Sequence, residues 1–502
     1  MPNDHTLSPI CTVRGVFTDD WPVSTAEATM RQTAGFTAAV GQTLLLAGTR
    51  HPMLLAGLGD RRTAGLGELR DAAAAAARRL RHLPAAQVEL DGLVVGSATP
   101  DEIARAAAEG VVLGAYRFDR HRAKSAPAEY FVGSAEAAAP ASAPAAAGDP
   151  APRSGETVWS GPAAGSPGAA GWAVGLRVGR AVCAARDLVN EPANIITPST
   201  FALHAERLAR ASGLDVVVSD EHELARLGMG GVLAVGKGSV ERPLLLTVTH
   251  AGAGGPVDLC LVGKGVTFDT GGLSLKPADG MIGMKHDMAG AAAAVVAMTL
   301  LEALAPTLHV KAFLPMVENM PGPYSTRPGD VVTMRGGTTV EILNTDFEGR
   351  LILGDALALA SDENPAALVD LATLTYAIVH ALGERTAGVF SNEPGLLAVV
   401  QAAAASSAEP VWHMPMPAYL EAQVDSGIAD IKNFPGVPSA RSSTAAMFLQ
   451  RFVPAGQAWA HLDIAGPAWS ESEYGVASPG GTGFGVRLLA DLFERLAAHR
   501  EA

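Results

Sequence analysis

The sequence is poor in charged residues, and basic residues are the scarcer kind. Charged residues make up 18% of the 502 residues, and 37 Lys and Arg stand against 51 Asp and Glu, which gives a formal net charge of −14. A chain this acidic has no general attraction for polyanions. The composition therefore argues against non-specific binding to nucleic acid or to an anionic membrane surface.

Cysteine is also scarce, and a long hydrophobic run is missing. Cys11, Cys183 and Cys260 are far apart, odd in number and form no CxxC pair, which argues against a disulfide framework and is typical of a reducing compartment. The first twenty residues contain no apolar signal-peptide core. The longest largely apolar run, 289–301, is shorter than the ~20 residues that cross a bilayer, so it predicts a buried core helix. We expect a cytoplasmic protein that does not enter a membrane.

Apolar residues, in contrast, are plentiful. They make up 48% of the chain, and the mean hydropathy is +0.21, which is enough for a sizeable core. Residues 1–134 mix short apolar runs with Ala-rich helical stretches, which predicts a small α/β domain. One helix is expected at 66–83, and another begins at the capping box that Thr99 opens. Strands are expected at 43–47, 53–58 and 92–96.

A change of composition divides the chain. Residues 135–172 contain four charged residues and are otherwise largely Ala, Pro, Gly and Ser, a composition that cannot bury enough apolar area to offset chain entropy. We interpret 135–172 as a linker, and the alternative is one continuous domain with a long inserted loop. In 173–502 near-continuous apolar runs alternate with helical stretches, which predicts a larger carboxy-terminal α/β domain with a mostly parallel central sheet. Its strands are expected at 214–218, 244–249, 257–262, 310–314, 367–371 and 459–464.

Four common catalytic motifs are absent. Asp258 stands at the first glycine of a Walker phosphate-loop pattern, and Gly265 replaces its Ser or Thr. The same segment has Phe268 at the last glycine of the dinucleotide-binding pattern. The zinc motif that starts at His222 lacks its second histidine, and no serine lies in a GxSxG frame. The sequence thus argues against NTPase, dehydrogenase and common esterase functions.

Charged residues gather instead in three apolar or glycine-rich segments, 262–276, 284–288 and 344–351. If these loops converge, they bring together four carboxylates, which are Asp269, Asp287, Asp346 and Glu348. Packed carboxylates repel and take up protons, whereas two divalent cations ~3.5–4 Å apart neutralise them. Asp346 and Glu348 are two apart, so in an extended chain both point to one side. The alternative is that these acids cap helices or pair with Lys264, Lys276 and Arg350.

The three segments resemble the signature of the leucyl aminopeptidase (cytosol aminopeptidase) family. The hallmark octapeptide of that family is NTDAEGRL, and residues 344–351 read NTDFEGRL, with one change. The resemblance extends from about residue 174 to 489, and it is looser in the amino-terminal part. Further matching segments lie at 186–192, 370–375, 428–433, 461–467 and 482–487.

The resemblance implies a two-metal peptidase domain over 173–502. By similarity, Asp269 and Glu348 bridge two divalent ions, usually zinc, with manganese or cobalt able to substitute. Lys264 and Asp287 complete one metal site, and Asp346 serves the other. The substrate is a peptide with a free amino terminus, and the reaction is hydrolytic release of its first residue.

Two further residues receive catalytic roles from the same resemblance. Lys276 stabilises the oxyanion that forms on the scissile carbonyl. Arg350 holds a bicarbonate-like anion that assists proton transfer in place of a side-chain base.

The resemblance also places a substrate pocket, and here the chain departs from the family. Phe347 replaces a small residue between two expected ligands, and Tyr376 stands where the family usually has glycine. These rings either pack as compensated core residues, or alter or narrow the pocket for the first side chain, or abolish activity. The expected substrate-binding residues are Met284, Asn344, Phe347, Leu374 and Tyr376.

Family resemblance further implies a homohexamer of two stacked trimers. An alternative function is a hexameric binding or regulatory assembly that binds DNA, with reduced or specialised peptidase activity. The acidic net charge counts against a nucleic-acid partner. A specialised dipeptidase is a further alternative.

Overall fold

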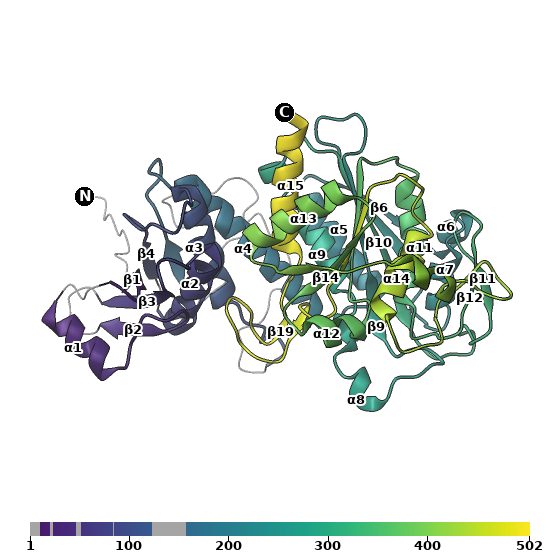
Figure 1. Cartoon of the computed structure of the whole chain (residues 1–502), viewed down its shortest axis with the longest axis horizontal. Coiled ribbons are helices and arrows are strands. Elements are labelled where there is room, and N and C mark those ends of the chain that lie inside the picture. The colour runs from purple at the N-terminus through teal and green to yellow at the C-terminus, as the bar shows by residue number, and fades with distance from the viewer. Residues whose placement is uncertain (1–10, 21–23, 47–51, 84, 123–156, 502) are drawn as a thin grey trace, which may run out of the picture. The chain divides into compact units, whose positions relative to one another are not determined.

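The computed structural model describes residues 11–501 apart from 21–23, 47–51, 84 and 123–156. The chain forms two compact α/β units (Figure 1). The smaller unit contains the described residues up to Cys183 together with 471–479, and the larger contains Ala184–Ser470 and Gly480–Ala502. Two α/β units, small and then large, confirm the predicted fold class. Among the described helices, none is both long and apolar enough to span a membrane.

The smaller unit is built on a five-stranded sheet with the strand order β2-β3-β1-β4-β5. Only the β2–β3 pair is antiparallel within this sheet. Its strands are β1 (Cys11–Phe17), β2 (Thr43–Leu46), β3 (Met53–Gly59), β4 (Ala85–Glu89) and β5 (Val158–Ser160). Its helices are α1 (Thr25–Thr33), α2 (Leu66–Leu80), α3 (Pro100–Ala115) and the first part of α4 (Ala169–Asn190).

Most of the predicted elements of this unit are confirmed, and one strand is wrong. Strands β2 and β3 and helix α2 lie where the apolar runs predict them, and the Thr99 hydroxyl accepts from the Glu102 backbone N–H at 3.2 Å, as a capping box requires. Residues 92–96 form turns instead of a strand, because Gly92 and Gly96 adopt left-handed φ angles of 73° and 55°. The strand of this region is β4, which precedes them.

The predicted linker at 135–172 is wrong at its carboxyl end. Residues 135–156 lie outside the described part of the chain. Val158–Ser160, however, forms β5, which pairs in parallel with β4, and α4 begins at Ala169. Trp159 of β5 packs against the core of the smaller unit, which composition alone does not reveal, so the boundary was misplaced.

The larger unit is built on a nine-stranded, mostly parallel sheet. Its strands follow the order β15-β14-β17-β13-β8-β10-β7-β6, and β9 pairs with the carboxyl half of β10. The central strands β17, β13, β8 and β10 are parallel, whereas β7 and β6 continue the sheet in antiparallel pairing. The strands are β6 (Asp215–Ser219), β7 (Leu244–His250), β8 (Leu259–Gly263), β9 (Gly265–Asp269), β10 (Val310–Asn319), β13 (Ala367–Ala372), β14 (Ala387–Ser391), β15 (Val411–His413) and β17 (Trp459–Asp463).

Helices cover the central strands on both sides. Every residue of β8 is buried. Cys260 and Val262 belong to a core cluster that includes Leu353 and Leu357 of α11 (Gly349–Ser361), so alternation directs Leu261 to the opposite face. Helix α9 (Ala289–Met298) packs on the same strands and is buried along its whole length, as its apolar sequence predicts. The remaining helices of eight or more residues are α5 (Pro198–Ala211), α13 (Pro394–Ser407), α14 (Arg441–Gln450) and α15 (Val486–Glu501).

A buried carboxylate fixes α11, the helix that begins at the Asp346–Arg350 loop. Asp355 is fully buried, and its two oxygens accept from the backbone N–H groups of Val232 at 2.9 Å and Arg335 at 2.8 Å. Burial raises the pKa of Asp355 to about 7, although the backbone donors oppose the rise. Asp355 thus ties α11 to α7 (Gly230–Gly236) and to the turn after β11 (Val331–Thr333).

Substitution of Asp355 tests this anchor. In Asp355→Asn one oxygen becomes an amide that faces a backbone N–H, so a buried donor loses its acceptor. We expect a loss of about 1–3 kcal/mol in the free energy of unfolding, measured by urea denaturation. Asp215→Asn, at an exposed position of β6, is the matched control and should change stability by less than ~0.5 kcal/mol. Equal stability of both variants would contradict the anchoring role.

Candidate metal centre

The three charged segments meet at the carboxyl ends of the central strands. Lys264 follows β8 directly, Asp269 is the last residue of β9, and Thr373 follows β13. Asp287 precedes α9, and Glu348 is the residue immediately before α11. Open α/β sheets bind ligands at this edge, because successive loops converge there. The predicted convergence of the loops is therefore present in the fold.

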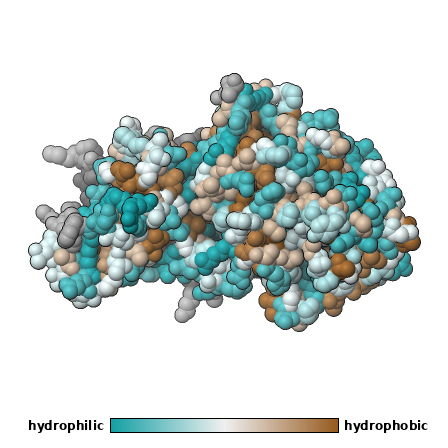
Figure 2. Space-filling model, viewed as in Figure 1, coloured by the Kyte–Doolittle hydropathy of each residue, from teal (hydrophilic) through white to brown (hydrophobic). Residues whose placement is uncertain are grey.

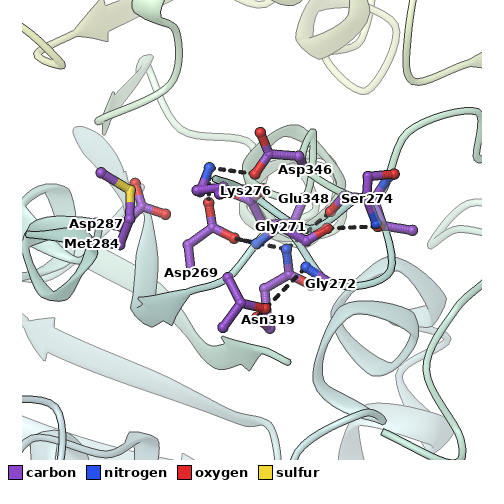
Figure 3. Close-up of polar contacts among 12 residues, drawn as sticks. Asp269, Gly271, Gly272, Ser274, Lys276, Met284, Asp287, Asn319, Asp346 and Glu348 are labelled. Carbon is purple, nitrogen blue, oxygen red and sulfur yellow. Dashed lines mark hydrogen bonds and ion pairs between the residues drawn. The ribbon is translucent and has the colours of Figure 1, made fainter. Parts of the chain in front are cut away.

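Lys276 lies between two of the carboxylates, as Figure 3 shows. Its Nζ is 2.8 Å from Asp269 Oδ2 and also pairs with Asp346. Ligand oxygens of Asp269, Asp346 and Glu348 all lie within 4.8 Å of one another, so this trio could hold a metal ion. The trio and Lys276 form one half of the site.

Lys264 occupies the other half in the same way. Its Nζ is 2.7 Å from Asp287 Oδ1 and 2.9 Å from Glu348 Oε1, and it donates to the Thr373 carbonyl at 2.9 Å. The Thr373 hydroxyl donates to Asp287 Oδ1 at 2.8 Å. Lys264 is only 3% exposed, so these protein contacts take the place of water around its ammonium group. Glu348 thus contributes to both halves of the site.

The donor set fits divalent cations. Asp287 Oδ2 and Glu348 Oε2 are buried, and neither has a hydrogen-bond partner among the described residues. Buried acceptors without a donor are costly and rare. Carboxylate oxygens around a shared Glu348 are the hard ligands that bind such ions, and a neutral lysine amine adds a nitrogen. The residues present therefore suit a pair of metal ions better than an isolated ion-pair network.

The charges of the cluster are strongly interdependent. Burial raises the pKa of Asp269 and of Asp287, and it raises the pKa of Asp346 to about 7. Burial alone would lower the pKa of Lys264. The negative charges of Asp287 and Glu348 raise this pKa by a larger amount, so the pKa of Lys264 lies above its usual value. Without metal, the ammonium groups act as internal counter-ions. A cation that takes the Lys264 nitrogen must displace its proton.

Surrounding residues hold these ligands in place, and sequence reasoning missed two of them. The Asn319 amide donates to Asp269 Oδ1 at 2.8 Å, and the Thr373 contacts are described above. Asn319 is the last residue of β10 and lies beside Asp269 at the end of β9. A polar residue at the end of an apolar strand was the sequence signal that could have identified it as a site residue. Gly349 is required for a different reason, because a Cβ there would lie 2.5 Å from Lys264 Cε.

Asp346 and Glu348 reach the cluster without the extended chain that their spacing suggested. Glu348 has helical backbone angles, φ −69° and ψ −39°, and Asp346 lies in a turn whose N–H donates to Asn344 Oδ1 at 2.8 Å. The turn brings both carboxylates to one side because α11 begins immediately after them. The expectation that 346–348 is an extended segment is therefore wrong, but the two carboxylates do point to the same side.

The expected pocket residues form two separate groups. The Tyr376 hydroxyl lies 4.0 Å from Met284 Sδ, and Tyr376, the first residue of α12 (Tyr376–Leu382), is 60% exposed. The Leu374 N–H donates to Asp463 Oδ1 at 3.2 Å, which fixes the loop before α12. Phe347 instead packs against Phe434, with ring centroids 4.9 Å apart. Tyr376 is thus no core residue.

Exposed apolar residues lie in the segment of the chain between Asp269 and Asp287. Leu275 is 59% exposed and Ile282 is 82% exposed, on either side of α8 (Ala278–Met281). Figure 2 shows hydrophobic colour at the lower edge, where Figure 1 labels α8, on a surface that otherwise mixes hydrophilic and hydrophobic residues.

Arg350 is buried beside the metal ligands. It is 2% exposed, and its Nε has no hydrogen-bond partner among the described residues. Burial lowers its pKa to about 9, although Glu348 and Asp463 oppose the shift. Its guanidinium lies over the Phe347 ring, 4.5 Å from the centroid. A buried guanidinium with a free N–H is suited to hold an anion.

Comparison with known proteins agrees with this geometry. The model of the cytosol aminopeptidase family catalytic domain matches residues 183–490, and that of its N-terminal domain matches 26–125. A probable cytosol aminopeptidase of Nocardia farcinica is 41% identical over 99% of this chain and 93% of its own length. One of Streptomyces coelicolor is 40% identical over 94% of this chain and 90% of its own length.

Solved structures give the same result. The bottromycin maturation enzyme BotP, in complex with Mn, has a TM-score of 0.85 and 37% identity, over 98% of this chain and 100% of that chain. A mutant of tomato leucine aminopeptidase has a TM-score of 0.82 and 30% identity, over 98% of this chain and 94% of that chain. The chain therefore belongs to the cytosol aminopeptidase family and is a metal-dependent aminopeptidase.

Proposed function

We propose that this chain hydrolyses the amino-terminal residue from peptides at a centre of two divalent metal ions. The observation that carries the proposal is a pair of buried carboxylate oxygens, Asp287 Oδ2 and Glu348 Oε2, that have no hydrogen-bond partner among the described residues. Two lysines pair with other carboxylate oxygens of the cluster. Lys264, Asp287 and Glu348 would hold one ion. Asp269, Asp346 and Glu348 would hold the other.

The choice of metal is part of the proposal. Zinc is the ion that the family usually carries, and the manganese bound by the BotP structure supports manganese as the alternative. When bound, two such ions supply Lewis-acid activation of water and of the scissile carbonyl.

The side chains supply the rest of the chemistry. Lys276, which pairs with Asp269 and Asp346, would be free to face the oxyanion of the scissile carbonyl once those carboxylates held metal. A cation placed there before the reaction stabilises developing negative charge without reorganisation. The Lys276 side chain is only 8% exposed, and the low local dielectric strengthens that interaction.

Arg350 is proposed to hold a bicarbonate-like anion. Its guanidinium is buried and its Nε lacks a partner among the described residues, so the group fits a small oxyanion. Such an anion would supply a proton acceptor for the reaction.

Tyr376 and Met284 are proposed to line the pocket for the first side chain. The Asp287 N–H donates to the Met284 carbonyl at 3.4 Å, Tyr376 is close enough to Asp287 to interact with its charge, and the exposed Tyr376 ring reaches Met284. The ring narrows this pocket relative to a glycine at the same position. Asn344 and Leu374 would complete the substrate contacts through the loops that they stabilise.

Assembly and location are proposed from the family alone. Homohexameric assembly follows the resemblance of the site segments to the family signature. Activity in the cytoplasm follows the name of the relatives, which are probable cytosol aminopeptidases.

Metal removal tests the proposal directly. Dialysis against a chelator should abolish hydrolysis of leucinamide, and zinc or manganese should restore it. Glu348→Gln should lower both the metal content and kcat/KM about 100-fold, because one residue serves both ions. Glu302→Gln, at a side chain that is 76% exposed, is the control. Full activity of the metal-free protein would refute the two-metal mechanism.

Substitution of Tyr376 tests the pocket. Tyr376→Gly should raise kcat/KM for amides of large first residues, such as phenylalanine, about tenfold relative to alaninamide, because the ring no longer limits the space. Tyr324→Gly removes another exposed ring, 75% exposed, and should leave the ratio unchanged. The pocket assignment fails if Tyr376→Gly has the substrate profile of the unaltered protein.

A further inference from the structure

Two arginines and two phenylalanines form a cluster beside the metal centre, and the roles given above to Arg350 and Phe347 leave Arg441 and Phe434 without one. Phe347 contacts Phe434 edge-on, with centroids 4.9 Å apart. The Arg441 guanidinium lies 5.9 Å from the Phe347 centroid and 5.5 Å from that of Phe434. Arg350 covers the Phe347 ring at 4.5 Å. Phe347, which adjoins both Asp346 and Glu348, thus lies against two guanidinium groups.

Among the described residues, neither the Arg350 nor the Arg441 guanidinium forms a salt bridge, although the charges of Glu348 and Asp463 act on Arg350. The Arg441 Nε donates to the Val437 carbonyl at 3.4 Å. The nearby Asp463 is engaged by the Thr375 hydroxyl at 2.7 Å and by backbone N–H groups of Leu374 and Ala465. Two cations packed this closely repel each other, and burying a charge without a partner is costly. An anion supplied from outside would relieve both costs.

The position of Arg441 is unfavourable for the helix that carries it. Arg441 is the first residue of α14, where the helix dipole disfavours a positive charge. The preceding Ala440 has a left-handed φ of 54°, which costs free energy in a residue with a Cβ. Arg441 is only partly buried, and the segment before it, 436–440, is exposed. A ligand can therefore reach this guanidinium.

The cluster lies on a different part of the site from the proposed pocket for the first side chain. Tyr376 and Met284 come from α12 and η1 (Met284–His286), beside Asp287. Phe347 and Phe434 come from the loops before α11 and α14, beside Asp346. If Tyr376 and Met284 receive the first residue of the substrate, Phe347 and Phe434 are left for the residue that follows the scissile bond.

We propose, on the basis of the function proposed above, that Arg441 binds a carboxylate on the second residue of the substrate, with Phe347 and Phe434 flanking that residue. In a dipeptide this carboxylate is the carboxyl terminus. In a longer peptide it is the side chain of Asp or Glu. The enzyme is therefore selective for dipeptides and for peptides with an acidic second residue.

A substrate series measures this selectivity. Leucylglycine carries a terminal carboxylate, leucylglycinamide carries none, and leucyl-aspartyl amide carries one on its side chain only. Kinetics are measured for the metal-loaded protein, for Arg441→Gln and for Arg441→Lys. Arg451→Gln, at the other end of α14 and 41% exposed, is the matched control.

We expect kcat/KM for leucylglycine to exceed that for leucylglycinamide about tenfold, mainly through KM, because a charge-assisted contact is lost in the amide. Arg441→Gln should reduce this ratio to about one, Arg441→Lys should retain part of it, and Arg451→Gln should keep it. If leucyl-aspartyl amide shares the advantage, both carboxylates are accepted, and if it does not, only the terminal one is.

Three results would overturn the proposal. The first is equal kcat/KM for leucylglycine and its amide, and the second is a preference that survives in Arg441→Gln. The third is a preference that vanishes in saturating bicarbonate, which would assign the guanidinium to a free anion. Failure to hydrolyse any of the three substrates would instead refute the aminopeptidase function on which the proposal rests.

Discussion

The catalytic unit depends on the neutralisation of four buried carboxylates. Asp269, Asp287, Asp346 and Glu348 meet in a space where burial raises the pKa of three of them, so the cluster exists only with compensating positive charge. Lys264 and Lys276 supply it in the structure. In the function proposed above, two cations would displace the proton of Lys264 and free Lys276 to face the substrate.

The fold delivers these groups with rigid elements. Lys264 follows β8, Asp269 ends β9 and Thr373 follows β13, and the parallel pairing of these strands in the sheet fixes the spacing of their loops. Gly349 leaves room for the Lys264 side chain, and Asp355 holds the middle of α11. Residues far from the metal ligands in sequence, such as Asn319 and Thr373, complete the hydrogen bonds of the carboxylates.

Sequence patterns predicted the fold class and six strands of the larger sheet, which are β6, β7, β8, β10, β13 and β17, and they marked the carboxylates that converge. They did so because buried parallel strands are continuous apolar runs and because charged residues inside such runs are conspicuous. They failed where short segments depend on tertiary pairing, as with 92–96, which forms turns, and Val158–Ser160, which completes a sheet. The cluster of Phe347, Phe434 and Arg441 was also invisible, since its members come together only through the packing of α14.

The lysine-bridged carboxylates are proposed to be a site for two metal ions. Crystals of the manganese-loaded protein, with anomalous scattering recorded at the manganese edge, test it most directly. We predict two peaks, one bounded by Asp269, Asp346 and Glu348 and one bounded by Lys264, Asp287 and Glu348, with Lys276 withdrawn from both acids. A single peak, no peak, or two lysines that still pair with the carboxylates at full occupancy would contradict the claim.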